Sequence, residues 1–150
     1  MKLNNIGIEK LIKLVDSTAE DYKEIMDTNV FSSFIFSKYA VKDKLKRKER
    51  RNDCIYFFSY WPYWIWGWNH NTMTKFSQRG LSPTIDKELR SQGIKTCIMC
   101  LSATKFDFEI GFGTTKEGVV KTIWETSDDV IEGILYVYTA KNKILEIWMK

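Results

Sequence analysis

The sequence has few residues that end helices or form tight turns, with 2 Pro and 8 Gly among 150 residues. It also lacks familiar catalytic signatures: no G-x-S-x-G segment would present a nucleophilic serine, and Gly113 to Gly118 lacks the Lys-Ser/Thr of a phosphate-binding loop. The single histidine, His70, is the one candidate for a general base that titrates near neutral pH, and its place in a polar turn favours a structural role. We therefore expect that the protein is not an enzyme and binds no cofactor.

Cysteine is also scarce, and its arrangement argues against a metal or disulfide site. The three cysteines are odd in number, and the N-terminal residues never reach the unbroken apolar stretch of a secretory signal, so we expect a reduced, cytoplasmic setting. Cys97 and Cys100 form a C-x-x-C motif, but their apolar neighbours predict a strand, in which residues three apart point to opposite faces. A zinc site would have to recruit Cys54 and His70, whose spacing resembles no zinc finger. We expect two buried structural cysteines and no bound metal.

The overall composition is that of a folded protein, with 44% apolar, 28% charged and 15% aromatic residues. Its length fits one domain, residues 1–150. The formal net charge of +4 comes from Lys42–Arg51, which holds seven Lys/Arg and two acidic residues. The rest of the chain is slightly acidic, so the basicity is a local patch.

The first half of the chain is predicted to be helical. Apolar residues from Ile8 to Val15 follow the i, i+3, i+4, i+7 spacing of one helical stripe. Ser17 and Glu20 have the spacing of a capping box that begins a second helix. Aromatic and aliphatic residues keep helical spacing from Phe31 onward into the basic segment. The expected helices are about 5–15, 18–27 and 31–51.

The second half is predicted to form strands with one short helix. Residues 54–61 are β-branched and aromatic, 94–101 are almost wholly apolar, and 105–112 alternate apolar and polar. Ser82, Pro83 and Gly93 mark the ends of a helix over 83–92. The expected fold class is α+β, with the helices packed on a mostly antiparallel sheet whose strands lie near 54–61, 94–101, 105–112, 119–124, 134–139 and 144–149.

The most unusual segment is Tyr56–Trp68, in which nine of thirteen residues are aromatic. No charged residue occurs from Cys54 to Thr74, a length that could span a bilayer, but Pro62 and several polar residues interrupt it. We expect no membrane insertion. The segment is then either a buried strand with an aromatic loop or an exposed binding platform, since large rings anchor protein interfaces and stack on bases or sugars. Its candidate partner-binding residues are Trp61, Trp64, Trp66 and Trp68.

Acidic residues in the second half could face a basic protein partner. Asp107 and Glu109 lie on one face of a predicted strand, a separation that two catalytic carboxylates could also use, although alternating charges on a solvated strand explain them as well. A nearby acidic turn could steer association electrostatically or simply be solvated. The candidate partner-binding acids are Asp107, Glu109, Glu125, Asp128 and Asp129.

The basic segment next to the aromatic one supports an alternative function. Nucleic-acid-binding proteins combine cations that contact phosphates with rings that stack on bases, although a cationic helix face is also commonly just solvated. The candidate nucleic-acid-binding residues are Lys44, Lys46, Arg47, Lys48, Arg50 and Arg51.

A family resemblance favours the protein-binding function. The segments Ile8–Leu11 (IEKL) and Ala19–Ile25 (AEDYKEI), followed by Asn29, resemble the opening of the SUKH superfamily, whose members begin with an I-E-x-L helix and a P-E-D-Y-K-E-F-L helix that ends in Asn-Gly. Ala19 and Val30 stand where that family has the proline and the glycine. The resemblance implies a small cytoplasmic immunity protein of a bacterial toxin system. We therefore predict a non-enzymatic protein that neutralises a cognate toxin by binding it, with a nucleic-acid-binding regulator as the alternative.

Overall fold

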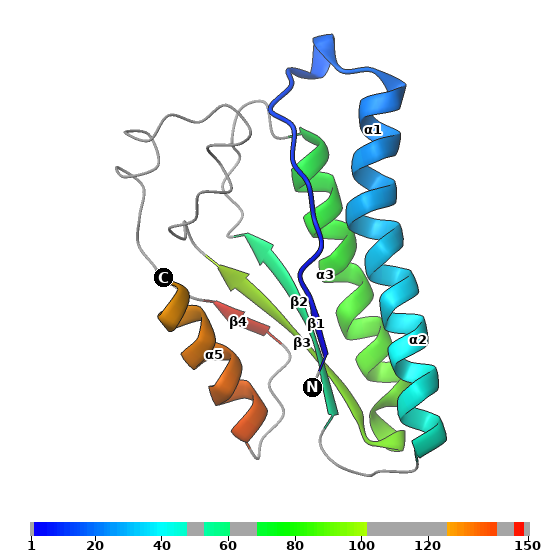
Figure 1. The fold of residues 1–150 in the computed structure, drawn as a ribbon, viewed down its shortest axis with the longest axis vertical. Helices are drawn as coiled ribbons and strands as arrows, with labels where there is room; N and C mark the ends of the chain where they lie inside the picture. Colours follow the sequence, from blue (N-terminus) through cyan, green and yellow to red (C-terminus); the bar gives the residue numbers. More distant parts are fainter. Residues whose placement is uncertain (1, 48–52, 61–68, 102–125, 141–145, 149–150) are drawn as a thin grey trace.

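Helices and strands alternate along the chain in the computed structural model, which describes residues 2–47, 53–60, 69–101, 126–140 and 146–148 (Figure 1). In chain order the elements are β1 (Lys2–Asn4), the 3-10 turn η1 (Leu14–Asp16), α1 (Ala19–Met26), the π-helical turn η2 (Asp27–Phe31), α2 (Ser32–Arg47), β2 (Asp53–Tyr60), α3 (Asn69–Leu89), the 3-10 turn η3 (Arg90–Gln92), β3 (Ile94–Leu101), α5 (Ser127–Thr139) and β4 (Glu146–Trp148).

The described strands form one parallel sheet in the order β1-β2-β3-β4. Asn4 pairs with Phe57, Phe57 with Ile98, and Ile98 with Glu146. The prediction of a mostly antiparallel sheet is therefore wrong, because a helix lies between successive strands and returns the chain to the same edge each time. The predicted strands 105–112 and 119–124 lie outside the described residues.

The sheet is buried on both faces, and successive residues of its strands enter two different cores. On one face Tyr56, Cys97 and Met99 pack against α5. On the other face Ile55, Phe57, Ile98 and Cys100 pack against α2 and α3. Burial on both faces explains the nearly continuous apolar run of β3, which is typical of parallel sheets. Figure 1 shows the same arrangement, with α2 and α3 on one side of the sheet and α5 on the other.

The two crossovers on either side of β3 have opposite hands. The sheet order follows the chain order from β2 to β4, while α3 covers one face and α5 covers the other. A crossover that advances in the same direction over the opposite face must have the opposite hand. Since nearly all such crossovers are right-handed, one of these two belongs to the uncommon class.

Residues 134–139, predicted as a strand, are the second half of α5. Their β-branched and aromatic side chains favour a strand, but Val130, Ile134 and Val137 are buried at helical spacing. Thr126 begins the helix with a capping box, in which its hydroxyl accepts from the backbone N–H of Asp129 and the Asp129 carboxylate accepts from the Thr126 backbone. The burial pattern and the cap therefore outweigh local strand propensity.

The predicted helix over 5–15 is also absent, since this segment is irregular up to η1. Both backbone groups of Ile8 bond to the side chain of Asn29, so they are not available to a helix. The predicted helix over 83–92 is the end of a much longer α3 followed by η3, and Gly93 ends it with φ of 82°. The capping box of α1 uses Thr18 and Asp21, one residue beyond the predicted pair.

The helix predicted over 31–51 exists as η2 and α2 as far as Arg47, but several of the aromatic residues whose spacing predicted it are not on its buried face. Phe31, Phe34 and Tyr39 are 58%, 49% and 61% exposed. The buried face of α2 consists instead of small or polar positions: Ser33, Ser37, Ala40 and Lys44. Among the helices in the described residues, none is both long and apolar enough to cross a membrane.

Candidate active site

A polar cluster lies where residues 5–13 leave β1 and pass the first turns of α3. In a parallel sheet the carboxyl ends of all strands share one edge, and ligands of open α/β sheets bind outside that edge. The chain leaves β1 at this edge, and α3 begins there with Asn69, whose side-chain amide donates to the Ile12 carbonyl at 3.2 Å (Figure 1). The cluster is therefore at the position where this type of sheet places its ligands.

Asn29 of η2 joins the segment to the helices and is 1% exposed. Its Oδ1 accepts from the Ile8 backbone N–H at 2.7 Å, and its Nδ2 donates to the Ile8 carbonyl at 2.8 Å and to Thr74 Oγ1 at 3.3 Å. The Asn29 carbonyl in turn accepts from Gln78 Nε2 at 3.0 Å. One side chain thus satisfies both backbone groups of Ile8 and fixes the irregular segment against α3.

The ionisable centre of the cluster is formed by Glu9 and Lys75. Glu9 is 5% exposed, and its Oε2 accepts from Asn71 Nδ2 at 3.2 Å. Lys75 lies one turn beyond Asn71 on α3 and is half-buried. Burial lowers the pKa of Lys75 to about 8, against the opposing effect of the Glu9 carboxylate, which raises it. This amine therefore loses its charge at a lower pH than an ordinary lysine does.

The α3 residues of the cluster follow helical spacing. Asn71, Thr74, Lys75 and Gln78 are at i, i+3, i+4 and i+7, so they share one face of the helix. The sequence prediction does not include them, because the residues of this face are polar and apolar periodicity does not mark it. A polar stripe at the spacing of a buried helix face is the signal that would have found them.

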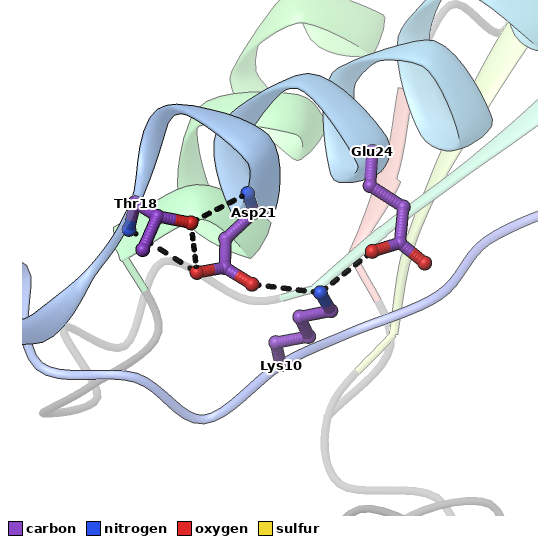
Figure 2. Close-up of polar contacts among 4 residues, drawn as sticks. All are labelled: Lys10, Thr18, Asp21 and Glu24. Atoms are coloured by element: carbon purple, nitrogen blue, oxygen red, sulfur yellow. Dashed lines mark hydrogen bonds and ion pairs between the residues drawn. The ribbon is translucent and has the colours of Figure 1, made fainter.

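Lys10 clamps the same segment to α1 (Figure 2). Its Nζ donates to Asp21 Oδ1 at 2.7 Å and to Glu24 Oε2 at 2.6 Å. The hydrogen bond from Lys10, together with those from the Thr18 hydroxyl and backbone, holds the pKa of Asp21 well below its usual range. The Asp21 carboxylate thus serves both as the clamp and as half of the capping box.

Three buried side chains in or near the cluster, Asn4, His70 and Gln78, have polar atoms without hydrogen-bond partners among the described residues. Asn4, the last residue of β1, is 5% exposed, and neither its Oδ1 nor its Nδ2 has a partner there. His70 is 3% exposed, its Nδ1 likewise has none, and its ring lies 6.1 Å from that of Tyr22. The prediction that His70 lies in a loop is wrong, because it is in the first turn of α3.

A groove of about 600 Å³ also opens between η2, the start of α2 and α3. It is lined mainly by apolar side chains, including Val30, Phe34 and Leu81, and Asp27 is its one ionisable residue. The groove therefore lacks a pair of acidic and basic side chains like Glu9 and Lys75 of the polar cluster.

The predicted partner-binding residues are not brought together in the part of the chain that is described. Asp128 and Asp129 are exposed in the first turn of α5, where Asp129 completes the capping box. The remaining candidates lie outside the described residues: Trp61, Trp64, Trp66, Trp68, Asp107, Glu109 and Glu125.

Of the three predicted nucleic-acid-binding residues that the structure describes, one is withdrawn from the surface. Lys44 is buried at 8% exposure, whereas Lys46 and Arg47 are exposed. Arg47 bonds to Asp43 one turn earlier, with 3.0 Å between Nη2 and Oδ2. Lys48, Arg50 and Arg51 lie outside the described residues.

The prediction for the C-x-x-C motif is confirmed. Cys97 and Cys100 are buried on β3, are not disulfide-bonded to each other, and enter the cores on opposite faces of the sheet. Within the described residues, no group of three or more His, Cys, Asp or Glu could hold a metal ion.

Comparison with known proteins relates this fold to dehydrogenases. No family model matches the sequence. A curated protein, 2-dehydro-3-deoxy-D-gluconate 5-dehydrogenase of Formosa agariphila, is 41% identical over 46 residues, which make up 31% of this chain and 17% of that protein.

Solved structures match over almost the whole chain. 4-Hydroxyisoleucine dehydrogenase complexed with NADH has a TM-score of 0.85 at 15% identity, covering 99% of this chain and 65% of its own. The closed form of serine dehydrogenase complexed with NADP+ has a TM-score of 0.83 at 20% identity, covering 98% and 62%. A metagenomic short-chain oxidoreductase in complex with NADP has a TM-score of 0.75 at 14% identity, covering 98% and 59%. The chain thus spans less than two thirds of each of these proteins.

These likenesses correct the functional predictions. The fold is the Rossmann-like α/β fold of the dehydrogenases, so the resemblance to the SUKH superfamily is wrong; its residues in 8–11 belong to an irregular segment rather than a helix. The prediction of a non-enzymatic, toxin-neutralising protein is contradicted, since the structural neighbours and the curated relative are oxidoreductases. The nucleic-acid-binding alternative gains no support from them. This chain therefore has, over nearly all of its length, the fold of dehydrogenases that are known in complex with NADH or NADP+.

Proposed function

We propose that this protein acts in an NAD(P)-dependent dehydrogenase reaction of the short-chain type, which interconverts a hydroxyl and a carbonyl group on a small organic substrate. The observation that carries the proposal is the superposition of 97–99% of the chain on dehydrogenases, including forms solved with NADH and NADP+. The polar cluster around Glu9 and Lys75 supports it, since it lies at the edge where such folds bind ligands.

The residues at this edge suit the nicotinamide half of the nucleotide. The Asn4 amide offers a donor and an acceptor that have no other partners among the described residues, and Lys75 offers an ammonium group. These groups would hold the amide and ribose hydroxyls of the nucleotide, which supplies or accepts a hydride when bound. The sequence contains no G-x-G-x-x-G segment, the turn that holds a pyrophosphate in many such folds, so we assign no pyrophosphate site to this chain.

The chain's own residues would position the substrate and manage its proton. Asn29 fixes the backbone of residues 5–13, which forms one wall of the site. Asn71 fixes the Glu9 carboxylate, and Lys75 presents a group that changes charge near neutral pH. Since several of the similar proteins are named for hydroxylated acids, we propose a small hydroxy acid as the substrate class.

We propose a reduced, cytoplasmic setting for the protein. Cys97 and Cys100 are both buried and lie on opposite faces of β3, so they cannot pair with each other. Such a placement suits a reduced compartment, where nicotinamide nucleotides are also present.

Titration of the full chain with NADH and NADPH tests the function directly. We expect saturable binding in the micromolar range, detected by calorimetry or by quenching of tryptophan fluorescence, and turnover of hydroxy acids with the oxidised nucleotide. Lys75→Met should weaken binding or turnover at least tenfold. Lys87→Met, an exposed position near the other end of α3, is the matched control and should change neither. Absence of saturable binding of either nucleotide up to millimolar concentration would overturn the proposed function.

A further inference from the structure

We propose that Lys10 is a positioning residue: it holds residues 5–13 against α1, and the affinity of the candidate site for its ligand depends on this tether. The inference rests on the proposed dehydrogenase function for the identity of the ligand, a nicotinamide nucleotide. Its structural basis is the set of contacts between residues 5–13 and the helices around them.

Residues 5–13 depend on side chains of other elements for their position. The segment contains no helix or strand of its own. Asn29 of η2 bonds to both backbone groups of Ile8, at 2.7 and 2.8 Å. Asn69 of α3 donates to the Ile12 carbonyl at 3.2 Å. These amides hold the segment on the side of η2 and α3.

Lys10 holds the segment from the side of α1. Its Nζ bonds to Asp21 Oδ1 at 2.7 Å and to Glu24 Oε2 at 2.6 Å, so the amine lies between the two carboxylates (Figure 2). The preceding residue, Glu9, is buried and accepts from Asn71 of α3 at 3.2 Å. Successive residues of the segment are thus fixed to different helices. A displacement of Lys10 therefore also moves the Glu9 carboxylate of the candidate site.

The two carboxylates of α1 make this tether depend on charge. Asp21 and Glu24 are three residues apart, so they lie on one face of the helix. Asp21 is fixed there, because its Oδ2 accepts from the Thr18 backbone N–H at 3.1 Å and from the Thr18 hydroxyl at 2.6 Å. A neutral side chain at position 10 would leave both negative charges beside the segment without the cation that joins them to it.

A second ion pair of α1 supplies a matched control. Lys23 bonds to Asp27 at 2.8 Å, but the two residues are four apart on one helical stretch, and their side chains are 77% and 58% exposed. This pair does not join α1 to residues 5–13. Lys23→Met therefore removes an equal charge from the same region and leaves the Lys10 tether in place.

Amide hydrogen exchange, measured by NMR on the free protein, tests the tether without any nucleotide. The Ile8 N–H reports on the segment, since it bonds to Asn29 and lies two residues from Lys10. The N–H of buried Ile98, in the middle of β3, reports on global unfolding. We expect Lys10→Met to increase the exchange rate of Ile8 about fivefold, as the loss of two partly exposed ion pairs would, and to change that of Ile98 less. Lys10→Arg keeps the charge and should restore the natural rate.

Three outcomes of this measurement would overturn the proposal. The first is an unchanged Ile8 rate in Lys10→Met. The second is an equal increase at Ile98, which would show a loss of global stability only. The third is an equal increase at Ile8 in Lys23→Met.

Salt tests the ionic nature of the tether in the natural chain, so the result does not depend on whether a variant folds. Between about 0.01 M and 1 M sodium chloride the screening length falls from about 30 Å to about 3 Å. We expect the Ile8 exchange rate to increase over this range in the natural chain and to stay constant in Lys10→Met. A rate that does not respond to salt in the natural chain would refute an ionic tether.

Nucleotide binding separates this inference from the proposed function. Lys10→Met should raise the Kd for NADH about fivefold and leave kcat at saturating ligand unchanged, because Lys10 acts through the position of the segment. Lys10→Arg should restore the Kd, and Lys23→Met should match the natural chain. If Lys10→Met binds NADH as tightly as the natural chain does, the dehydrogenase function stands and the positioning role is refuted. If the natural chain binds neither NADH nor NADPH, the proposed function fails and the effect on affinity fails with it, whereas the Ile8 exchange rates still decide whether Lys10 holds the segment.

Discussion

Asn29 supplies the backbone hydrogen bonds that a helix or strand would otherwise provide to Ile8. The segment that follows β1 has no helix or strand to satisfy its backbone, and Asn29 supplies one acceptor and one donor to Ile8. A carboxylate at this position could accept from the Ile8 N–H but could not donate to its carbonyl. The structure therefore requires an amide at position 29. The resemblance to the SUKH superfamily places Asn29 at the end of a helix and does not explain this requirement.

Replacing Asn29 tests this role. Asn29→Ala leaves the backbone N–H and C=O of Ile8 without their partner in a partly buried place, and we expect a loss of about 3 kcal/mol in the free energy of unfolding. Urea denaturation would measure it. Thr28→Ala, at the preceding position, is the control and should cost less than about 1 kcal/mol. Equal effects of the two changes would show that the amide does not hold the segment.

Lys75 should also make the free energy of unfolding depend on pH. Its pKa falls from 10.5 to about 8 on folding, because burial disfavours the charged form. Between these pH values the unfolded chain binds more protons than the folded one, so the free energy of unfolding rises with pH through Lys75. Below pH 8 both states are protonated, and the cost of burying the cation is fully present.

The matched comparison is Lys75→Met, which cannot titrate. Between pH 8 and pH 10.5, the free energy of unfolding of the natural chain should rise by about 2 kcal/mol more than that of the variant. Urea denaturation at each pH measures both. Other lysines and tyrosines titrate in both proteins, and their contributions cancel in the difference. Parallel curves would show that Lys75 keeps an ordinary pKa in the folded protein.

At the scale of the elements, α2 and α3 bury mostly polar positions and expose aromatic ones such as Phe34 and Phe76. The buried positions of α3 are mostly polar, from Asn71 through Gln78 and Ser82 to Asp86. Thr96 Oγ1 donates to the Ser82 carbonyl at 2.6 Å, so β3 satisfies a group of the helix near Pro83. Hydrophobic periodicity could not predict α3, because the pattern that marks its buried face is one of hydrogen-bonding side chains.

The buried face of α2 predicts that a change at Ser37 destabilises the protein more than a change at Tyr39. The apolar pattern of the sequence alone would predict the opposite order. Ser37 is 2% exposed and lies one turn from Ser33, which accepts from Gln78 Nε2 of α3 at 2.8 Å. Ser37→Leu would force a larger side chain into this close contact, and we expect a loss of about 2 kcal/mol in the free energy of unfolding. Tyr39→Ser, at 61% exposure, should cost less than about 1 kcal/mol. If Tyr39→Ser lowers the denaturation midpoint more than Ser37→Leu does, the aromatic face of α2 is the one that packs in the core.

At the scale of the whole molecule, the parallel sheet was within reach of the sequence. Residues 54–61 and 94–101 were predicted as strands and are β2 and β3, and the apolar run of β3 already indicated burial on both faces. The sequence pattern nevertheless favours an antiparallel sheet, because it predicts only the last part of α3, within 83–92, and predicts part of α5, residues 134–139, as a strand. With both helices in place, the alternation of strand and helix predicts a parallel α/β sheet. The site was out of reach, since Glu9, Asn29 and Lys75 meet only through the tertiary fold.

The central strand β3 makes its two cysteines reporters of how the two cores unfold. Cys97 belongs to the core that includes α5, and Cys100 to the core that includes α2 and α3, although they are only three residues apart. A thiol reagent reaches either sulfur only when its core opens. If the sheet and both helix layers unfold as one cooperative unit, the two sulfurs must react at the same rate.

We therefore expect equal labelling rates for Cys97 and Cys100 in a Cys54→Ser background, measured by mass spectrometry after exposure to a maleimide under native conditions. Both rates should increase together in low concentrations of urea, because global unfolding exposes both faces of β3 at once. Labelling in strong denaturant gives the intrinsic reactivity of each thiol and corrects for any difference between them. A Cys97 that still reacts faster after this correction would show that α5 detaches while α2 and α3 remain packed, and that the two faces of the sheet are separate units of stability.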